Sequence, residues 1–213
     1  MSNKVNIYKE RSKKYFDKQS TNFFDTFDGK FCSLMYEGVM QKIRTQPFNS
    51  ILDVGCGTGA ILSLVISEYK GIKACGIDLS EKMIEKSAEL LGQSVQLIVG
   101  DSDNLPWADN SFDLVLCNSS FHHFPEPLKV LKEIRRVLKS NGKIIIADPW
   151  WSNSKIFFIN LFLNSPLNFL ADVKIYSETE TRKLLTECGF VSIEWDIVGN
   201  KYSIAIAVAG KLV

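Results

Sequence analysis

Short apolar runs alternate with helical patterns along the chain from residue 49 onward. Near-continuous apolar runs bounded by Gly, Asp or Asn are typical of strands that are covered on both faces. The pattern predicts five such strands, at Ser50–Val54, Lys73–Ile77, Val95–Val99, Phe112–Cys117 and Lys143–Ala147. Strands that alternate with helices in this way indicate an α/β fold with a largely parallel sheet.

Capping residues predict the helices between these strands. A helix over Ile61–Tyr69 follows the first strand, and Ser80 can cap a helix that runs through Leu91. Proline suits the first turn of a further helix over Pro127–Lys139, which Asn141-Gly142 is expected to stop.

The C-terminal part of the chain follows a different pattern. Ser177–Glu180 reads as a capping box that opens a helix closing at Gly189. Two strands are then predicted, Val191–Val198 and Ser203–Ala209, and the joint over 199–202 is short enough for an antiparallel hairpin. The expected fold is therefore a doubly wound seven-stranded sheet, mostly parallel with one antiparallel strand near the C-terminal edge, and with helices on both faces.

The chain of 213 residues fits one domain with a single core. Within this domain, changes in composition and pattern along the sequence predict four parts. These are a helical arm or lid, a ligand-binding core, an inserted helical cap, and a final helix with a hairpin, at 1–48, 49–148, 149–176 and 177–213.

Charge and cysteine content exclude several classes of protein. Lys and Arg total 25 against 24 for Asp and Glu, so the net charge of +1 gives no electrostatic reason to expect nucleic acid or a membrane surface. The most apolar segment, Ile156–Ala171, is interrupted by polar residues and is shorter than the ~20 residues of a spanning helix. Five scattered cysteines without a CxxC pair, and no signal-peptide start, predict a cytoplasmic protein with neither a disulfide framework nor a zinc site.

A glycine-rich loop in "ILDVGCGTGA" follows the first predicted strand and precedes a helix. In open α/β sheets, ligands bind in the crevice beyond the carboxyl ends of the strands. Gly55, Gly57 and Gly59 would permit a sharp turn and close backbone approach there, next to the free N–H groups of the helix. Glycines alone are a weak signal, and a tight turn without a ligand also fits.

Three acidic residues strengthen the ligand interpretation. Asp53, Asp78 and Asp101 end or follow three successive predicted strands, so they would line one edge of the sheet. Asp78 comes 19 residues after Gly59, and an acid about 20 residues beyond such a loop can accept the hydroxyls of a ribose. Each aspartate alone also fits a cap or turn, but the set together with the glycines favours a nucleotide-like ligand.

The loop also matches the G-x-G-x-x-A pattern of nicotinamide dinucleotide sites through Gly55, Gly57 and Ala60. Tyr69 and Lys73 even spell the Tyr-x-x-x-Lys of some dehydrogenases, but they would lie behind the crevice, which indicates a chance match. Asp53 would place negative charge beside a pyrophosphate. A ligand with a cationic head group fits better.

Four segments, in order, resemble class I S-adenosylmethionine-dependent methyltransferases. They are "LDVGCGTG", "GIDLSEKMIEKSAE", "GDSDNLPWADNSFDLVLCNSSFHHF" and "EIRRVLKSNGKIIIAD". The likeness is greatest to the branch typified by ubiquinone and menaquinone biosynthesis methyltransferases, and it covers roughly residues 50 to 148. It implies a Rossmann-like fold with S-adenosylmethionine as cofactor and S-adenosylhomocysteine as product. The N-terminal arm and the cap match much less.

The resemblance implies which residues face the methionine part of the cofactor. The loop of Gly55, Cys56, Gly57 and Gly59 would pack against it, and Asp53 would lie near its ammonium group. Asn118, just after the fourth strand, would lie near the same end. In the arm, Tyr15 is a candidate for contacting it.

The resemblance also implies the nucleoside contacts. Asp78 would take the ribose hydroxyls, and Leu79 would touch the adenine face. Asp101 would accept from the adenine amino group, with Ser102 beside it. Met83 would pack on the adenine or in the core.

Methyl transfer from a sulfonium is an in-line displacement that needs a base only when the nucleophile carries a proton. His122 and His123, the only histidines, follow the fourth strand, where the methyl group should point. Either is a candidate catalytic base or a residue that orients the acceptor, although a packing or capping role also fits. Neighbouring residues often project differently, so joint action and a shared metal ion are not expected.

The segment from Asp148 to Val173 holds Trp150, Trp151 and a run of Phe and Leu. It predicts a helical flap over a small apolar or aromatic acceptor, or a core or homodimer contact. The basic residues near Lys9 are interpreted as a solvated helix face. The predicted function is a small-molecule methyltransferase; the alternatives are a cofactor-binding protein without turnover and an NAD-dependent oxidoreductase. The sequence leaves open whether carbon, oxygen or nitrogen receives the methyl group.

Overall fold

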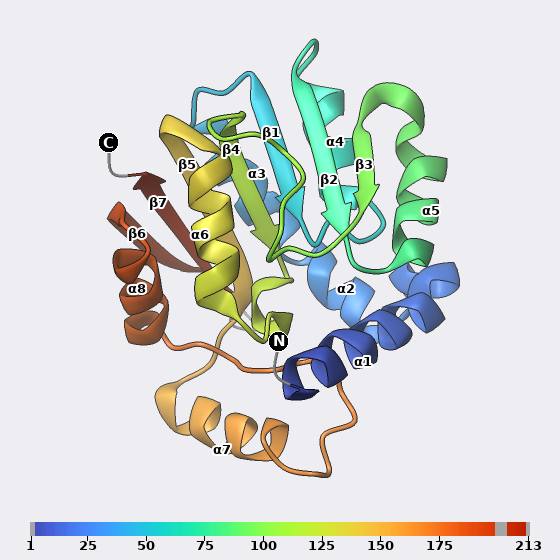
Figure 1. Cartoon of the computed structure of the whole chain (residues 1–213), viewed down its shortest axis with the longest axis vertical. Helices are drawn as coiled ribbons and strands as arrows, with labels where there is room; N and C mark the ends of the chain where they lie inside the picture. The colour runs from blue at the N-terminus through green and yellow to red at the C-terminus, as the bar shows by residue number, and fades with distance from the viewer. Residues whose placement is uncertain (1–2, 199–203, 212–213) are drawn as a thin grey trace.

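The computed structural model describes residues 3–198 and 204–211. A seven-stranded sheet lies at its centre, in the order β3-β2-β1-β4-β5-β7-β6 (Figure 1). The strands are β1 Ser50–Val54, β2 Lys73–Asp78, β3 Gln96–Val99, β4 Phe112–Asn118, β5 Leu138–Pro149, β6 Phe190–Val198 and β7 Ile204–Lys211.

The sheet has the predicted topology. Strands β1 to β5 pair in parallel, and β7 is antiparallel to both β5 and β6. Strand β1 pairs with β2 on one side and β4 on the other, so the chain reverses its direction of travel across the sheet at β1. Such a switch point is where open α/β sheets bind ligands. The predicted hairpin joint 199–202, with Ser203, lies outside the described residues.

The helices surround this sheet. They are α1 Asn3–Gln19, η1 Ser20–Asp25, α2 Phe27–Ser33, α3 Tyr36–Arg44, α4 Ala60–Glu68, α5 Glu81–Leu91, η2 Gly92–Ser94, η3 Phe121–His123, α6 Pro127–Val137, α7 Asn153–Leu163 and α8 Glu178–Glu187. Two predicted caps are confirmed: Ser80 accepts from Met83 N, and Ser177 forms a capping box with Glu180. Within the described residues, the structure has no helix with both the length and the apolar character needed to cross a membrane.

The predicted end of α6 was wrong. The helix stops at Val137, and Leu138 already pairs with Phe112 of β4. The next pair is Leu114 with Lys143, so residues 139–142 form an irregularity within β5 and do not stop a helix. Leu138 is fully buried, and packing its side chain against the sheet outweighs its helical propensity.

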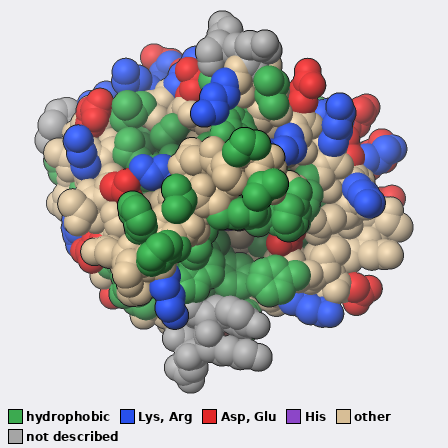
Figure 2. All heavy atoms as spheres, turned by 90° about the horizontal axis from the view of Figure 1, so that it is seen from below, with side chains coloured by type: hydrophobic (Ala, Val, Ile, Leu, Met, Phe, Trp, Pro, Cys, Tyr) green, Lys and Arg blue, Asp and Glu red, His purple; other side chains and the backbone are tan. Residues whose placement is uncertain are grey.

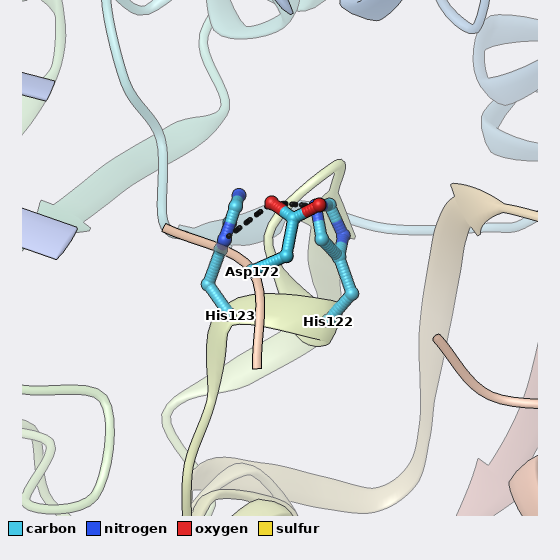
Figure 3. A group of neighbouring side chains, drawn as sticks. All are labelled: His122, His123 and Asp172. Carbon is cyan, nitrogen blue, oxygen red and sulfur yellow. Dashed lines mark ion pairs between the residues drawn. The ribbon is translucent and has the colours of Figure 1, made fainter. Parts of the chain in front are cut away.

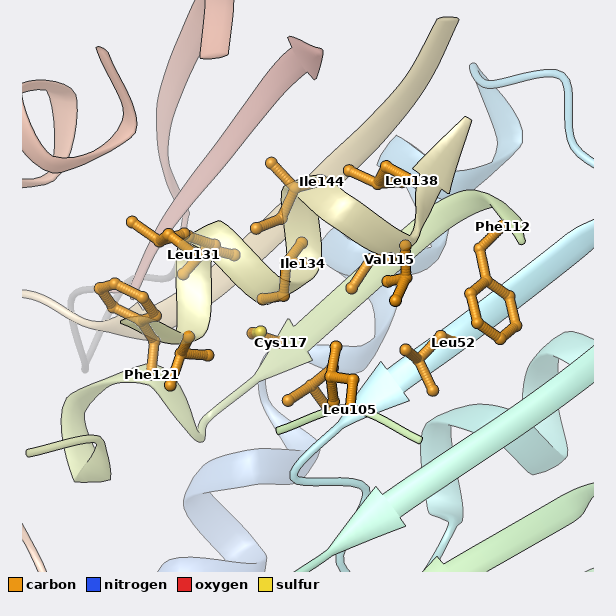
Figure 4. Packing of buried hydrophobic residues seen from close by; sticks show 14 of the residues in the cluster. Leu52, Leu105, Phe112, Val115, Cys117, Phe121, Leu131, Ile134, Leu138 and Ile144 are labelled. Atoms are coloured by element: carbon orange, nitrogen blue, oxygen red, sulfur yellow. The ribbon is translucent and has the colours of Figure 1, made fainter. Parts of the chain in front are cut away.

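Alternating strand residues supply the cores of the two faces. Leu52 and Val115 point into a cluster under α6 and α8, which Figure 4 shows in detail. Their neighbours Ile51 and Leu114 point into the opposite cluster, against α3 and α4. Both faces of the strands are therefore covered, as the continuous apolar runs predicted.

The cap formed by α7 lies apart from these cores, beyond the carboxyl ends of the strands and near α1 (Figure 1). Its own cluster buries Ile156, Leu163 and Ile175, with partly buried aromatic residues around them. On its outer side, Phe157 and Phe158 are exposed. The cap thus packs mainly through one small cluster of its own.

Candidate functional site

A cavity of about 350 Å³ opens at the carboxyl edge of the sheet. Its walls come from α1, α2, the glycine loop, the ends of β1, β2 and β4, and the cap. Seen from this side, the molecule has a hollow that hydrophobic side chains surround (Figure 2). The volume is within the range of small-molecule sites, about 300–1,000 Å³.

Most of the predicted site residues line this single cavity. They are Asp53, Gly55, Cys56, Gly57, Asp78, Leu79, Met83, Asp101, Ser102, Asn118, His122 and His123. Gly59 and Tyr15 do not line it. Tyr69 and Lys73 do not line it either, and Tyr69 instead packs on Phe48 with ring centroids 4.8 Å apart. The dehydrogenase-like pair is therefore remote from the site.

The three glycines of the loop have different structural roles, although all three have positive φ. A Cβ on Gly55 would lie 2.5 Å from Ser120 Cβ, and one on Gly59 would lie 2.3 Å from Ser87 Oγ, so both glycines allow close packing. A Cβ on Gly57 would meet no protein atom within 4 Å. The backbone at Gly57 is therefore bare toward the cavity, and Gly59 serves the packing of the loop rather than the cavity wall.

Asp53 is the least compensated charge of the site. Its side chain is buried, with 1% exposure, and neither carboxylate oxygen has a hydrogen-bond partner among the described residues. Burial, and then the nearby charge of Asp78, raise its pKa well above the usual range. An unpaired buried carboxylate is costly unless a cationic or donor group meets it. The ammonium of S-adenosylmethionine is such a group, so this wall of the cavity fits the cofactor.

Asp78 is held in place by the loop that it faces. Its oxygens accept from Gly57 N at 2.9 Å and from Ser80 N at 2.8 Å. Burial raises its pKa, and these backbone bonds oppose the shift. The carboxylate is thereby fixed at the switch point. Nearby Met83 is 1% exposed and lines the cavity, so it is both a core residue and a wall residue.

Asp101 forms an ion pair with Lys9, a residue that the sequence analysis assigned to a solvated helix face. Lys9 Nζ on α1 donates to Asp101 Oδ2 and to Asp103 Oδ2, both at 2.6 Å. The interpretation of Lys9 as part of a solvated face was therefore wrong, because the carboxylates after β3 attract it. These ion pairs hold α1 over the Asp101 end of the cavity.

Tyr15 lies on α1 just outside the cavity wall, to which its neighbour Phe16 contributes. Its hydroxyl donates to Asp28 Oδ2 at 2.9 Å. Burial and the Asp28 charge raise the pKa of Tyr15 to about 12, so the phenol is neutral at physiological pH. Its contact with the methionyl group remains a prediction.

The two histidines turn toward one another, contrary to the expectation that neighbours diverge. Their ring centroids lie 3.9 Å apart in η3. His122 Nε2 lies 3.7 Å and His123 Nδ1 lies 3.5 Å from the same oxygen, Asp172 Oδ1 (Figure 3). The geometry places both rings on the cavity wall, facing one carboxylate.

The histidines differ in charge state. His122 Nδ1 lies 3.0 Å from Asp148 Oδ1. Burial alone would lower the pKa of His122, but Asp148 and Asp172 outweigh it and raise the value to about 9. Burial and the charge of His122 lower the pKa of His123 well below the usual range. At neutral pH the site therefore pairs a charged imidazolium with a neutral imidazole.

Asp172 and Asp148 were not among the predicted site residues. Between residues 148 and 173 the charged side chains are Asp148, Lys155 and Asp172, in an otherwise apolar and polar run. An acid at each end of an apolar flap is the signal that could have identified them, because an unpaired carboxylate rarely enters such a segment. The return of the chain to η3, where Val173 N donates to His122 O at 3.0 Å, was not readable from spacing.

All five cysteines carry free thiols, and Cys32 and Cys56 line the cavity. Burial raises the pKa of Cys32 to about 11 and the pKa of Cys56 well above its usual value. Both remain protonated near neutral pH, so neither is an activated nucleophile.

Comparison with known proteins identifies the class of this domain. Residues 52–146 match the methyltransferase domain family. A demethylmenaquinone methyltransferase of Staphylococcus epidermidis is 41% identical over 116 residues, which are 52% of this chain and 47% of that protein. One from Thermotoga maritima is 36% identical over 107 residues, covering 50% and 46%. The chain spans about half the length of the curated relatives that it matches.

The fold extends the likeness over more of the chain. A SAM-dependent methyltransferase from Aquifex aeolicus has a TM-score of 0.69 and 22% identity, covering 92% of this chain and 98% of that one. The resemblance to class I S-adenosylmethionine-dependent methyltransferases of the menaquinone and ubiquinone branch is confirmed over the matched part of the chain, residues 52–146. The unpaired carboxylate of Asp53 suits the cationic head group of S-adenosylmethionine, the cofactor that this resemblance implies.

Proposed function

We propose that this protein transfers the methyl group of S-adenosylmethionine to a small apolar or aromatic acceptor and releases S-adenosylhomocysteine. The observation that supports this most is the buried, unpaired carboxylate of Asp53 beside the bare backbone of Gly57. Both face a cavity that continues to the histidines and the cap. One cavity thus offers a binding site for the methyl donor and space for an acceptor.

The donor side uses the carboxylates at the strand ends. Asp53 would pair with the ammonium group, and Asp78 would accept from the ribose hydroxyls. Each oxygen of Asp78 takes one backbone N–H, and a carboxylate oxygen can accept a second hydrogen bond. Asp101 would accept from the adenine amino group while it keeps its pair with Lys9. Bound in this way, S-adenosylmethionine supplies an already activated methyl group.

The acceptor side is mostly aromatic and apolar. Phe16, Phe31, Trp151 and Leu170 line it, which favours an apolar or aromatic acceptor. The name of the Staphylococcus epidermidis relative, a demethylmenaquinone methyltransferase, is in keeping with such an acceptor. In this arrangement the residues mainly align the acceptor with the methyl group and exclude water.

His122 and His123 are proposed to act on the acceptor. The charged ring of His122, held by Asp148, would orient an acceptor oxygen or stabilise negative charge on it. The neutral ring of His123 could take a proton from the acceptor. Replacing the active histidine by Gln should reduce turnover while leaving cofactor affinity nearly unchanged. Unchanged turnover in both single variants would refute a catalytic role.

A test of the activity uses S-adenosylmethionine with a labelled methyl group and a metabolite extract. We expect label to appear in an extractable, apolar product only in the presence of the protein. Saturable cofactor binding without any labelled product would instead favour a binding protein without turnover. Thermal stabilisation by NAD, but not by S-adenosylmethionine, would favour the oxidoreductase alternative.

We further propose that the protein is cytoplasmic and that it forms a homodimer. The five free thiols suit a reducing, cytoplasmic compartment. A second copy of the chain is proposed to cover the outer face of α7, where Phe157, Phe158 and Leu161 are exposed. Light scattering after size exclusion should give a dimer, and Phe158→Ser should shift the protein toward monomer. A wild-type monomer at all concentrations would refute the dimer.

A further inference from the structure

Three possible ligand atoms converge on one point of the cavity wall. His122 Nε2 and His123 Nδ1 lie 3.7 and 3.5 Å from Asp172 Oδ1, and all three atoms lie within 4.8 Å of one another (Figure 3). Two ligands on one tetrahedral ion are about 3.4 Å apart when each bond is about 2.1 Å long. The two separations from Asp172 Oδ1 are therefore close to those between ligands of one ion, and both are long for direct hydrogen bonds.

We propose that His122, His123 and Asp172 bind a divalent transition-metal ion, such as Zn²⁺, on the acceptor side of the cavity. Two imidazoles and a carboxylate are a donor set that suits first-row transition metals, whereas Mg²⁺ and Ca²⁺ prefer oxygen ligands alone. The site would depart from the sequence-based expectation of no shared ion. That expectation assumed diverging rings.

An outer contact orients the imidazole of His122 for this role. His122 uses Nδ1 to pair with Asp148 Oδ1 at 3.0 Å, which leaves Nε2 directed at Asp172. His123 Nδ1 lies 3.5 Å from Asp172 Oδ1 and has no hydrogen-bond partner among the described residues. Metal-binding histidines usually have their second nitrogen held by a carboxylate or a backbone carbonyl, as that of His122 is.

The charges around the cluster also favour a divalent cation. Asp28, Asp148 and Asp172 all act on His122 electrostatically, so three carboxylates surround this corner of the cavity. The opposing cation nearby is Arg11, which donates to the backbone oxygens of Asn168 and Asp172. Binding of the ion to His122 Nε2 would release the proton of that imidazolium, and the corner would then keep an excess of negative charge that a divalent ion balances.

The site leaves room for a ligand on the ion. All three residues line the cavity, next to the space assigned to the acceptor. Catalytic metal sites commonly have three protein ligands and one open position. The role of the ion rests on the proposed function, and in the metal-bound protein the ion would take the place of the two histidines: it would hold an acceptor oxygen and favour its deprotonated form. Binding of the ion does not depend on that role.

The binding test needs neither cofactor nor acceptor. Protein stripped of metal with a chelator is titrated with Co²⁺, followed by visible absorption, and with Zn²⁺, followed by calorimetry. We expect saturation near one equivalent, and affinities at least about 10- to 100-fold weaker for His123→Ala and Asp172→Asn, since loss of a ligand's outer partner alone costs that much. Asp53→Asn is the matched control, because it removes a cavity carboxylate outside the cluster and should bind the metal as the wild type does.

Absence of saturable binding by the wild-type protein would overturn the proposal. Wild-type affinity in both His123→Ala and Asp172→Asn, with circular dichroism unchanged, would overturn the assigned ligands. The role of the ion is tested separately, by methyl transfer after chelation and after Zn²⁺ is restored. We expect at least a tenfold fall and recovery in kcat/KM. Undiminished turnover after chelation would refute the role and leave the methyltransferase proposal standing.

Discussion

The proposed cofactor half of the cavity is built on buried strands, whereas the proposed acceptor half is built largely on a cap that is joined to the sheet by loops. In the first half, Gly55 N and Cys56 N both donate to Ile77 O, so the glycine loop is bonded directly to β2. In the second half, the amide of Asn160 bonds the backbone of Ile175 in both directions, at 2.8 and 2.9 Å. In this half, hydrogen bonds from side chains to the backbone hold the segment in place, where strand pairing does so in the other half.

This difference shows which half of the cavity has its residues placed by the sheet alone. The strand ends place Asp53 and Asp78 without help from the cap, because both belong to the sheet. Asp172 reaches the histidines only when the cap has folded back onto η3. The donor site therefore follows from the architecture, and the acceptor site from a segment that can vary while the sheet stays intact.

The largest expected effect contrasts the two cores. Leu131→Ala removes a fully buried side chain under α6 and should cost about 2–5 kcal/mol of global unfolding free energy. Ile156→Ala is the matched change in the cap cluster, where it should mainly loosen α7. Urea unfolding and amide hydrogen exchange measure the two effects. Equal global losses for both variants would show that cap and sheet unfold as one unit.

The glycine loop allows the next comparison. Gly59→Ala places a Cβ 2.3 Å from Ser87 Oγ at a φ of +78° and should cost about 3 kcal/mol, from strain and overpacking together. Gly71→Ala is the control, because it has the same φ with no atom within 4 Å and should cost about 1–2 kcal/mol. Denaturant unfolding measures both. The account of loop packing fails if the two variants are equally stable.

The acceptor half should respond to alkaline pH. The pKa of His122 is about 9 in the folded protein, above the usual 6.5, so its charged form stabilises the fold. This contribution, about 1–3 kcal/mol, is fully present below pH 6.5 and is lost as the pH rises through about 9. In chelator, the unfolding free energy of the wild type should fall between those values. His122→Gln should remove most of that fall, and an unchanged slope would contradict the ion pair.

The smallest effect concerns the arm. Lys9→Met removes the ion pairs to Asp101 and Asp103, and Lys129 still pairs with Asp103 at 3.1 Å. We expect about 1 kcal/mol less stability and faster proteolysis within α1. Lys13→Met, which removes a half-exposed pair with Asp17 within α1, is the control and should change neither. Equal proteolysis of the two variants would refute the role of Lys9.

The donor half could be predicted from the sequence because local patterns specify it. The continuous apolar run around Leu52, the caps at Ser80 and Ser177, and the glycine loop all depend on residues close together in the chain. The acceptor half could not, because the pairing of His122 with Asp148 and Asp172 depends on long-range return of the chain. The same reason explains why Lys9 was misplaced: its partners lie about a hundred residues away in the sequence, on another element.

Calorimetric titration of S-adenosylmethionine into the wild type and into Asp53→Asn tests the central claim most directly. If the carboxylate of Asp53 receives the ammonium group, the wild type should bind saturably. The variant should bind at least about 30-fold more weakly, as expected for loss of one partner of a buried charge pair. Asp113→Asn is a control outside the cavity and should bind as the wild type does. Wild-type affinity in a folded Asp53→Asn would contradict the account.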